Sequence, residues 1–260
     1  MAVRNVDVVL VIDASPSMRP CLDQLRLHLR ELIKPMQGYM DNVRFGMVSL
    51  TGAPHPLFCK GRKGVGPGPR YWITTLASND GTASLQALYG KAPNQQELMT
   101  SDSGRVISSM DSIQIGSDED NLLALDIALD HPFGPVSTTK RVVAIFADEP
   151  LETGIKGAAT GQYIPALIEK IHQRRVKLFC ALPYSDLAQE LSQANGSEIE
   201  TVDGGQGLSS VNFSALLTQM AKSISVSSQQ SGPEERYQRA LFGQDKWLSG
   251  IEPGQVRDNE

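Results

Sequence analysis

The sequence predicts a doubly wound α/β fold, in which a mostly parallel sheet carries helices on both faces. Two continuously apolar segments, 8–12 and 142–146, are typical of strands that are buried on both sides in a parallel sheet. Strand-like and helix-like segments alternate along the chain, as right-handed crossover connections require. With 260 residues, 40% of them hydrophobic, the chain is long enough to bury a sizeable core.

The first half of the chain begins with a buried strand over Val8–Ile12. A helix should follow, capped by Ser17 and ended by the sequence KPMQG, with leucine and isoleucine at helical spacing. A second strand is expected over 43–52. The Gly- and Pro-rich segment 53–70 cannot continue as a helix or central strand and predicts a long loop. Further along, we expect a strand over 71–78 and short helices over 84–90 and 105–113.

The second half repeats this order with clearer signals. The segment GSDEDNLLALDIALDHPFG predicts a helix with Ser and Asp near its start and Pro and Gly at its end. KRVVAIFADEP then reads as a buried strand that ends in an aspartate, Asp148. The remaining elements are expected to be a helix over 162–175, a strand over 176–185, a helix over 186–196, a strand over 198–203 and a helix over 212–224.

The predicted domain covers residues 1–226, and residues 227–260 read as a linker followed by a tail. A Ser- and Gln-rich opening indicates the linker. The segment 231–243 has Pro at the first helical position and Gly after the last, which predicts a short amphipathic helix. The tail would either fold back onto the domain or dock on a partner through the apolar residues Tyr237, Leu241, Phe242 and Trp247.

Composition excludes several classes of protein. The formal charge of −5 provides no basic field for a phosphate backbone, so nucleic acid is not an expected partner. Three widely spaced cysteines suggest neither a disulfide framework nor a zinc site, and they fit a reducing compartment. The short apolar run at the start lacks a secretory cleavage pattern, and no segment has the apolar length needed to cross a bilayer. We expect a cytoplasmic protein without membrane contact.

The stretch VDVVLVIDASPSM places an aspartate and two serines directly after the first strand. Asp13 and Asp148 both end strands of a parallel sheet, and ligands bind outside such carboxyl ends, where the strand order reverses. Ser15 and Ser17 would present hydroxyl oxygens beside Asp13. Hard oxygen ligands of this mixed type suit Mg²⁺ or Mn²⁺ better than Ca²⁺. The alternative is that these residues only cap the first helix.

The spacing Asp-x-Ser-x-Ser, together with Asp148 and the order of elements, resembles the metal ion-dependent adhesion site of von Willebrand factor A (VWA) domains. The resemblance covers residues 5 to 226 and implies that Ser15 and Ser17 bind the metal directly. Asp13 and Asp148 would bind directly or through water. The threonine that normally supplies the middle ligand is absent from the sequence GSDEDN. The resemblance therefore implies Ser117 or Asp118 in that role, and Asp120 as a weaker alternative.

The resemblance implies that the site recognises a protein and performs no catalysis, because a partner's Glu or Asp would complete the metal's coordination. This chain is more similar to intracellular bacterial VWA proteins, including those associated with tellurite resistance, than to extracellular adhesive ones. The resemblance therefore implies an adaptor or scaffold that works with an ATPase, kinase or phosphatase partner in a bacterial stress or defence system.

Two other functions stay open at this point. A haloacid dehalogenase-like phosphatase also has an aspartate at the end of its first strand, but its acid/base aspartate would fall at Ser15. A VWA domain that no longer binds metal would instead interact through the tail and the basic loop. The cations of that loop are Lys60, Arg62, Lys63 and Arg70.

Overall fold

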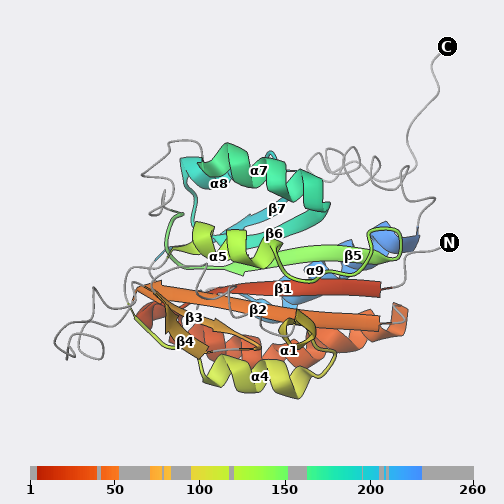
Figure 1. Ribbon diagram of the computed structural model, residues 1–260, viewed down its shortest axis with the longest axis horizontal. Helices are drawn as coiled ribbons and strands as arrows, with labels where there is room; N and C mark the ends of the chain where they lie inside the picture. The colour runs from red at the N-terminus through yellow and green to blue at the C-terminus, as the bar shows by residue number, and fades with distance from the viewer. Residues whose placement is uncertain are drawn as a thin grey trace, which may run out of the picture.

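The computed structural model describes residues 5–39, 42–52, 71–77, 79–82, 95–116, 120–151, 163–194, 196–204, 208 and 211–229. One sheet contains seven strands, which are β1 (Asn5–Asp13), β2 (Asn42–Gly52), β3 (Tyr71–Thr75), β4 (Asn79–Thr82), β5 (Thr139–Phe146), β6 (Val176–Leu182) and β7 (Glu198–Thr201). Their order in space is β4-β3-β2-β1-β5-β6-β7 (Figure 1).

The sheet is mostly parallel. Strand β1 pairs in parallel with β2 on one side and with β5 on the other, and β6 and β7 continue the parallel arrangement. Strands β3 and β4 pair antiparallel at one edge. Because the chain proceeds from β1 towards β4 on one side and then returns to place β5 on the other, the strand order reverses beside β1.

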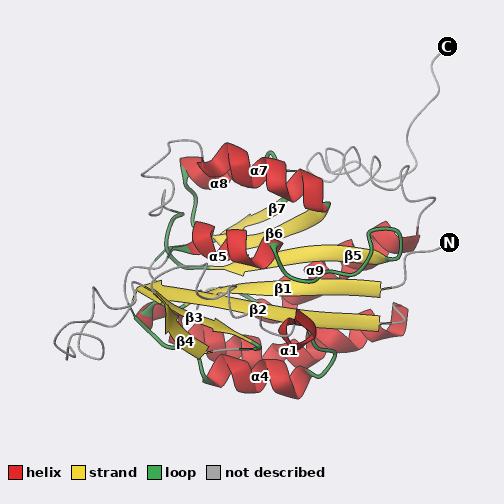
Figure 2. Cartoon of the chain, viewed as in Figure 1, coloured by secondary structure: helices red, strands yellow, loops and turns green. Residues whose placement is uncertain are grey.

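Helices cover both faces of the sheet (Figure 2). The helices α1 (Arg19–Tyr39), α4 (Ser103–Asp111) and α9 (Phe213–Gln229) contribute to the core on one face. The other core includes α5 (Asn121–Leu129), α7 (Tyr163–Arg174) and α8 (Asp186–Leu191). This arrangement confirms the predicted doubly wound α/β fold. Within the described ranges, no helix combines the length and the apolar composition that a bilayer span requires.

Strand β1 shows why its sequence is continuously apolar. Val8, Leu10 and Ile12 point into the core on the α1 side, whereas Val9 and Val11 point into the core on the α5 side. Every residue from Val6 to Asp13 is buried. A strand at the centre of a sheet that is covered on both faces has no solvent-facing side, so alternation with polar residues is lost.

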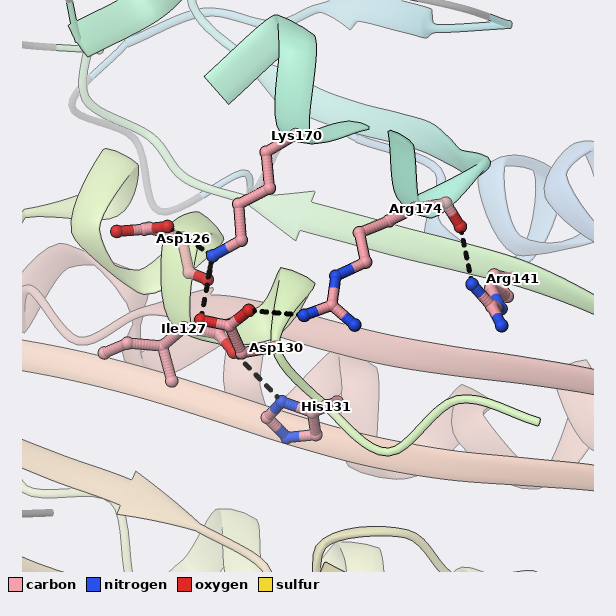
Figure 3. A network of polar contacts seen from close by, with 7 residues as sticks. All are labelled: Asp126, Ile127, Asp130, His131, Arg141, Lys170 and Arg174. Carbon is pink, nitrogen blue, oxygen red and sulfur yellow. Dashed lines mark hydrogen bonds and ion pairs between the residues drawn. The ribbon is translucent and has the colours of Figure 1, made fainter. Parts of the chain in front are cut away.

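A polar network joins α5 to α7 (Figure 3). Lys170 Nζ donates to Asp126 Oδ1 at 2.6 Å and to Asp130 Oδ2 at 2.8 Å. Arg174 Nη2 also donates to Asp130, at 3.0 Å. Every residue of α5 except Asp126 is buried. Asp126 is partly exposed and forms an ion pair with Lys170 of α7. The network therefore fastens α7 to the buried helix that packs on the centre of the sheet.

His131 follows α5 and is buried against β2. Its Nδ1 lies 3.2 Å from the carbonyl oxygen of Ile127, and its Nε2 has no hydrogen-bond partner among the described residues. A Cβ atom at Gly46 would lie 2.8 Å from His131 Cδ2 and 2.8 Å from Met99 Sδ. Burial lowers the pKa of His131 to about 4, so the imidazole is neutral at physiological pH. The ring therefore packs as a neutral core group.

Asp7 forms a second polar cluster near the start of β1. Arg44 binds it with two hydrogen bonds, from Nε to Oδ1 at 2.8 Å and from Nη2 to Oδ2 at 2.7 Å. The Gly134 amide donates to Asp7 Oδ2 at 2.7 Å. The Asp7 side chain is 1% exposed, so these donors satisfy a carboxylate that water does not reach. The cluster joins β1, β2 and the segment after α5.

Three local predictions differ from the structure. The prediction that Ser17 caps the first helix is wrong, because Ser17 lies inside a 3-10 turn, η1 (Pro16–Met18), that precedes α1. Helix α1 continues through Pro35 to Tyr39 instead of ending at KPMQG. A proline removes one backbone donor, but the helix is anchored by buried residues in its earlier turns. Strand β4 was not predicted, since its sequence NDGT has no apolar pattern.

Candidate functional site

The turn after β1 holds its polar side chains in a fixed arrangement. Asp13 is the last residue of β1 and is fully buried. The Ser15 amide donates to Asp13 Oδ1 at 2.7 Å, which closes a turn of the type that aspartate favours. Pro16 then begins η1, and the side chain of Met18, the last residue of η1, is buried. The turn therefore places Ser15 and Ser17 beside Asp13 rather than along one helix face.

Asp148 reaches the same place from β5. The strand register pairs Ile12 with Phe146, so the chain positions that follow the two strands lie at one edge of the sheet. Ser17 Oγ lies 3.0 Å from Asp148 Oδ1, and Ser15 Oγ lies 3.3 Å from the same oxygen. Asp148 is fully buried. The structure thus brings four of the predicted site residues together, namely Asp13, Ser15, Ser17 and Asp148.

The side-chain oxygens of this cluster lie within hydrogen-bond reach of one another. Ser15 Oγ and Ser17 Oγ are 2.9 Å apart, and each also contacts Asp148 Oδ1. Each serine hydroxyl can donate one hydrogen bond, so the two hydroxyls can donate two bonds among these three oxygens. Asp13 Oδ2 is buried and has no hydrogen-bond partner. A buried acceptor without a donor is costly, so the cluster is suited to a positive charge.

The electrostatic environment of Asp13 supports the same interpretation. The pKa of Asp13 is raised from 3.8 to about 6, mainly by burial and also by the negative charges of Asp148 and Glu149. The hydrogen bond from the Ser15 amide acts in the opposite direction. A carboxylate whose ionised form is penalised in this way gains most from a cation placed beside it.

Cys21 lies in the first turn of α1, and its thiol is near enough to Asp13 and Asp148 to be affected by their charges. Burial raises the pKa of the Cys21 thiol well above its usual range, and the charges of Asp13 and Asp148 add to the effect. The thiol is therefore neutral at physiological pH.

The predicted middle ligands Ser117 and Asp118 lie outside the described residues. Gly116, which precedes them, is held close to the site, because its amide donates to the Ala14 carbonyl oxygen at 3.1 Å. Asp120 is the N-cap of α5, where its Oδ1 accepts from the Leu123 amide at 2.9 Å. The predicted partner-contact residues are also outside the described residues; they are Lys60, Arg62, Lys63, Arg70, Tyr237, Leu241, Phe242 and Trp247.

The donor set fits a small hard cation. Two carboxylates and two hydroxyls converge from β1, η1 and the segment after β5, and Mg²⁺ and Mn²⁺ accept such oxygens with water completing their coordination. Within the described ranges, no three His, Cys, Asp or Glu side chains gather as a metal-binding group. Binding would therefore depend on the serine hydroxyls as well as on Asp13 and Asp148.

Comparison with known proteins supports the fold. No protein-family model matches the sequence, and no curated protein matches it either. Among solved structures, the chain is similar to the crystal structure of the SpRpn10 VWA domain, with a TM-score of 0.50 and 11% sequence identity. The match covers 82% of this chain and 94% of that one. With its strand order, its two helical layers and this match, the chain has the fold of a von Willebrand factor A domain.

Proposed function

We propose that this protein is a metal-dependent interaction module, in which the cluster at Asp13 binds Mg²⁺ or Mn²⁺ and thereby recognises an acidic residue of a protein partner. The observation that carries the proposal is the buried oxygen cluster with its unpaired Asp13 Oδ2. Asp13, Ser15, Ser17 and Asp148 would hold the ion, together with Ser117 or Asp118. Once bound, the cation would attract a carboxylate in a partly desolvated place.

The arrangement favours binding over phosphoryl transfer. A phosphatase of the haloacid dehalogenase type needs a carboxylic acid two residues after its aspartate, and Ser15 occupies that position here. The Ser15 hydroxyl contacts Asp148 and Ser17 instead of facing outwards alone. A cytoplasmic adaptor role, with an ATPase, kinase or phosphatase as partner and a bacterial stress or defence system as setting, is part of this proposal and rests on the resemblance to intracellular VWA proteins.

Thermal unfolding of the full chain tests the metal site. A ligand that binds only the folded state at a hundredfold excess over its Kd stabilises it by about 2.7 kcal/mol. We expect Mg²⁺ and Mn²⁺ to raise the Tm relative to EDTA, Ca²⁺ to do so less, and Asp13→Ala to abolish the rise. Asp102→Ala is the matched control, because Asp102 caps α4 through the Gly104 amide and lies in a different element. This variant should lose some stability and keep the full response to Mg²⁺.

A peptide with one central glutamate tests recognition. It should bind wild type in Mg²⁺, lose binding in EDTA, and fail to bind when the glutamate is replaced by glutamine. Equal Tm values with EDTA and with every divalent ion would contradict the metal site. Interaction through the basic loop and the tail would then become the working hypothesis, tested by replacing Lys60, Arg62, Lys63 and Arg70 or by deleting residues 230–260.

A further inference from the structure

The rim of the proposed metal site is built by three chain segments that pack together. The Ala147 amide donates to the Ala181 carbonyl oxygen at 3.0 Å, and the Val202 amide donates to the Leu182 carbonyl oxygen at 3.2 Å. A Cβ atom at Gly204 would lie 3.4 Å from the Asp148 carbonyl oxygen and 3.5 Å from Pro183 Cγ. Segments 147–151, 183–186 and 202–204 therefore form one continuous border beside Asp148.

The exposed groups on this border share one sign of charge. Glu149 follows the buried Asp148 directly and is exposed, and Asp203 is exposed next to Gly204. In the described residues of these three segments, every charged side chain is acidic. Arg19, at the start of α1, is the one cation in the segment 13–20. The border is therefore negative on the side of β5, β6 and β7.

Tyr184 adds an aromatic surface to the same border. Its side chain is 63% exposed, and it follows Pro183, which packs close to Gly204. The Tyr184 hydroxyl donates to Gln189 Oε1 at 2.9 Å, so the exposed ring is held by α8. Arginine and lysine side chains stack favourably on exposed aromatic rings and pair with neighbouring carboxylates.

The unpaired, fully buried Asp13 Oδ2 marks a ligand site inside this border. We infer that the partner presents its metal-binding Glu or Asp within a basic segment, so that flanking Arg or Lys side chains lie against Glu149, Asp203 and Tyr184. This inference rests on the proposed function. A partner carboxylate without such flanks would approach two rim carboxylates of its own sign, which disfavours binding at low ionic strength.

Two labelled peptides test the inference by fluorescence anisotropy. Both carry one central glutamate, flanked by arginines in one peptide and by serines in the other. In Mg²⁺ at low salt, we expect the arginine-flanked peptide to bind wild type about threefold to tenfold more tightly, since exposed ion pairs are individually weak. The double variant Glu149→Gln and Asp203→Asn should reduce that preference to below twofold. The control is the double variant Glu97→Gln and Glu169→Gln, which removes the same amount of charge elsewhere on the surface. This variant should retain the preference for the arginine-flanked peptide.

The outcomes separate this inference from the proposed function. The Mg²⁺-induced rise in Tm should be present in wild type and in both double variants, because none of the four replaced residues is a proposed ligand. Equal affinity for the two peptides, or no binding of either, would overturn the basic partner and leave the metal site intact if that rise persists. A preference for arginine that is unchanged in EDTA would also overturn the inference, and no rise in Tm with Mg²⁺ would remove both proposals.

Discussion

Ser17 Oγ lies 3.0 Å from Asp148 Oδ1, although the two residues are 131 positions apart in the sequence. The contact joins the turn after β1 to the segment after β5, across the place where the strand order reverses. Parallel strands make such a meeting possible, because their carboxyl ends lie at one edge of the sheet.

Asp13→Asn should stabilise the metal-free protein at neutral pH. The pKa of Asp13 is raised from 3.8 to about 6 in the fold, mainly by burial. The ionised form is therefore disfavoured, and wild type loses stability as pH rises from about 4 to above 6. Asparagine keeps the acceptor for the Ser15 amide and carries no charge.

In EDTA at pH 7.5, we expect Asp13→Asn to be more stable by up to about 3 kcal/mol, with no difference near pH 3.5. Chemical denaturation across this pH range measures the effect. A variant that is less stable than wild type at pH 7.5 would show that burial does not penalise the Asp13 charge.

Ser17→Ala should weaken metal binding with little effect on the fold. Ser17 is only partly buried and contacts just Asp148 and Ser15 in the hydrogen bonds described above. We expect the Mg²⁺ concentration needed for a given rise in Tm to increase at least tenfold, the range seen when supporting contacts of a metal are lost. Unchanged Mg²⁺ dependence, with a normal Tm in EDTA, would exclude Ser17 as a ligand.

His131 should make the fold sensitive to acid. Burial lowers its pKa from 6.5 to about 4, so the folded state resists protonation that the unfolded state accepts. This stabilisation is complete above pH 6.5 and is lost as pH falls to 4, by about 3 kcal/mol. Asp13 acts in the opposite direction over part of that range, so the pH dependence must be compared between variants.

The comparison is between wild type and His131→Leu in EDTA. The difference in their free energies of unfolding should change by about 3 kcal/mol between pH 7 and pH 4, in favour of the leucine variant at low pH. A constant difference over this range would mean that His131 does not titrate as a buried neutral group.

Arg44→Ala should destabilise the protein by about 2–4 kcal/mol. The substitution leaves the buried Asp7 carboxylate with the Gly134 amide as its remaining described donor, and an uncompensated buried charge is costly. Adding Asp7→Asn removes that charge and should recover part of the loss. Urea denaturation of both single variants and the double variant measures the coupling. Additive effects of the two substitutions would contradict a direct pairing.

Gly46→Ala should cost about 1–3 kcal/mol, the usual range for overpacking a core. The added methyl would meet His131 Cδ2, Met99 Sδ and the backbone oxygen of Leu98, the last at 3.1 Å. Gly104→Ala is the matched control, because its methyl would meet only the Asp102 side chain at the exposed start of α4. Equal effects of the two alanines on Tm would show that the space at Gly46 is not restricted.

Runs of apolar residues predict the central strands of the sheet, but they do not predict the edge strand β4. Val8–Ile12 and Val142–Phe146 are continuously apolar because both faces of their strands are buried, and this property is visible in the sequence. Strand β4 has no such property, since backbone pairing with β3 alone defines it. The length of α1 was underestimated, because packing of its earlier turns outweighs the local effect of Pro35.

The sequence predicts the part of the site where aspartate or serine directly follows a buried strand. Asp13, Ser15, Ser17 and Asp148 could be selected because carboxyl ends of buried strands were recognisable. The convergence of both hydroxyls on one oxygen of Asp148, and the nearness of Cys21, depend on the path of η1 and α1 in space. Asp203 and Tyr184 lie in segments without a sequence motif, so only the packing of Gly204 reveals their place on the border.

The direction of β1 has a practical consequence for surface-based binding assays. The strand starts at Asn5 and ends at Asp13, so it separates its first residue from the oxygen cluster by about 25 Å at the usual rise per residue. In Figure 1 the start of β1 and the carboxyl ends of the parallel strands lie at opposite ends of the sheet. Coupling the protein to a sensor chip at the start of β1 would therefore leave the cluster facing the flowing analyte, whereas random coupling through lysines would not orient it.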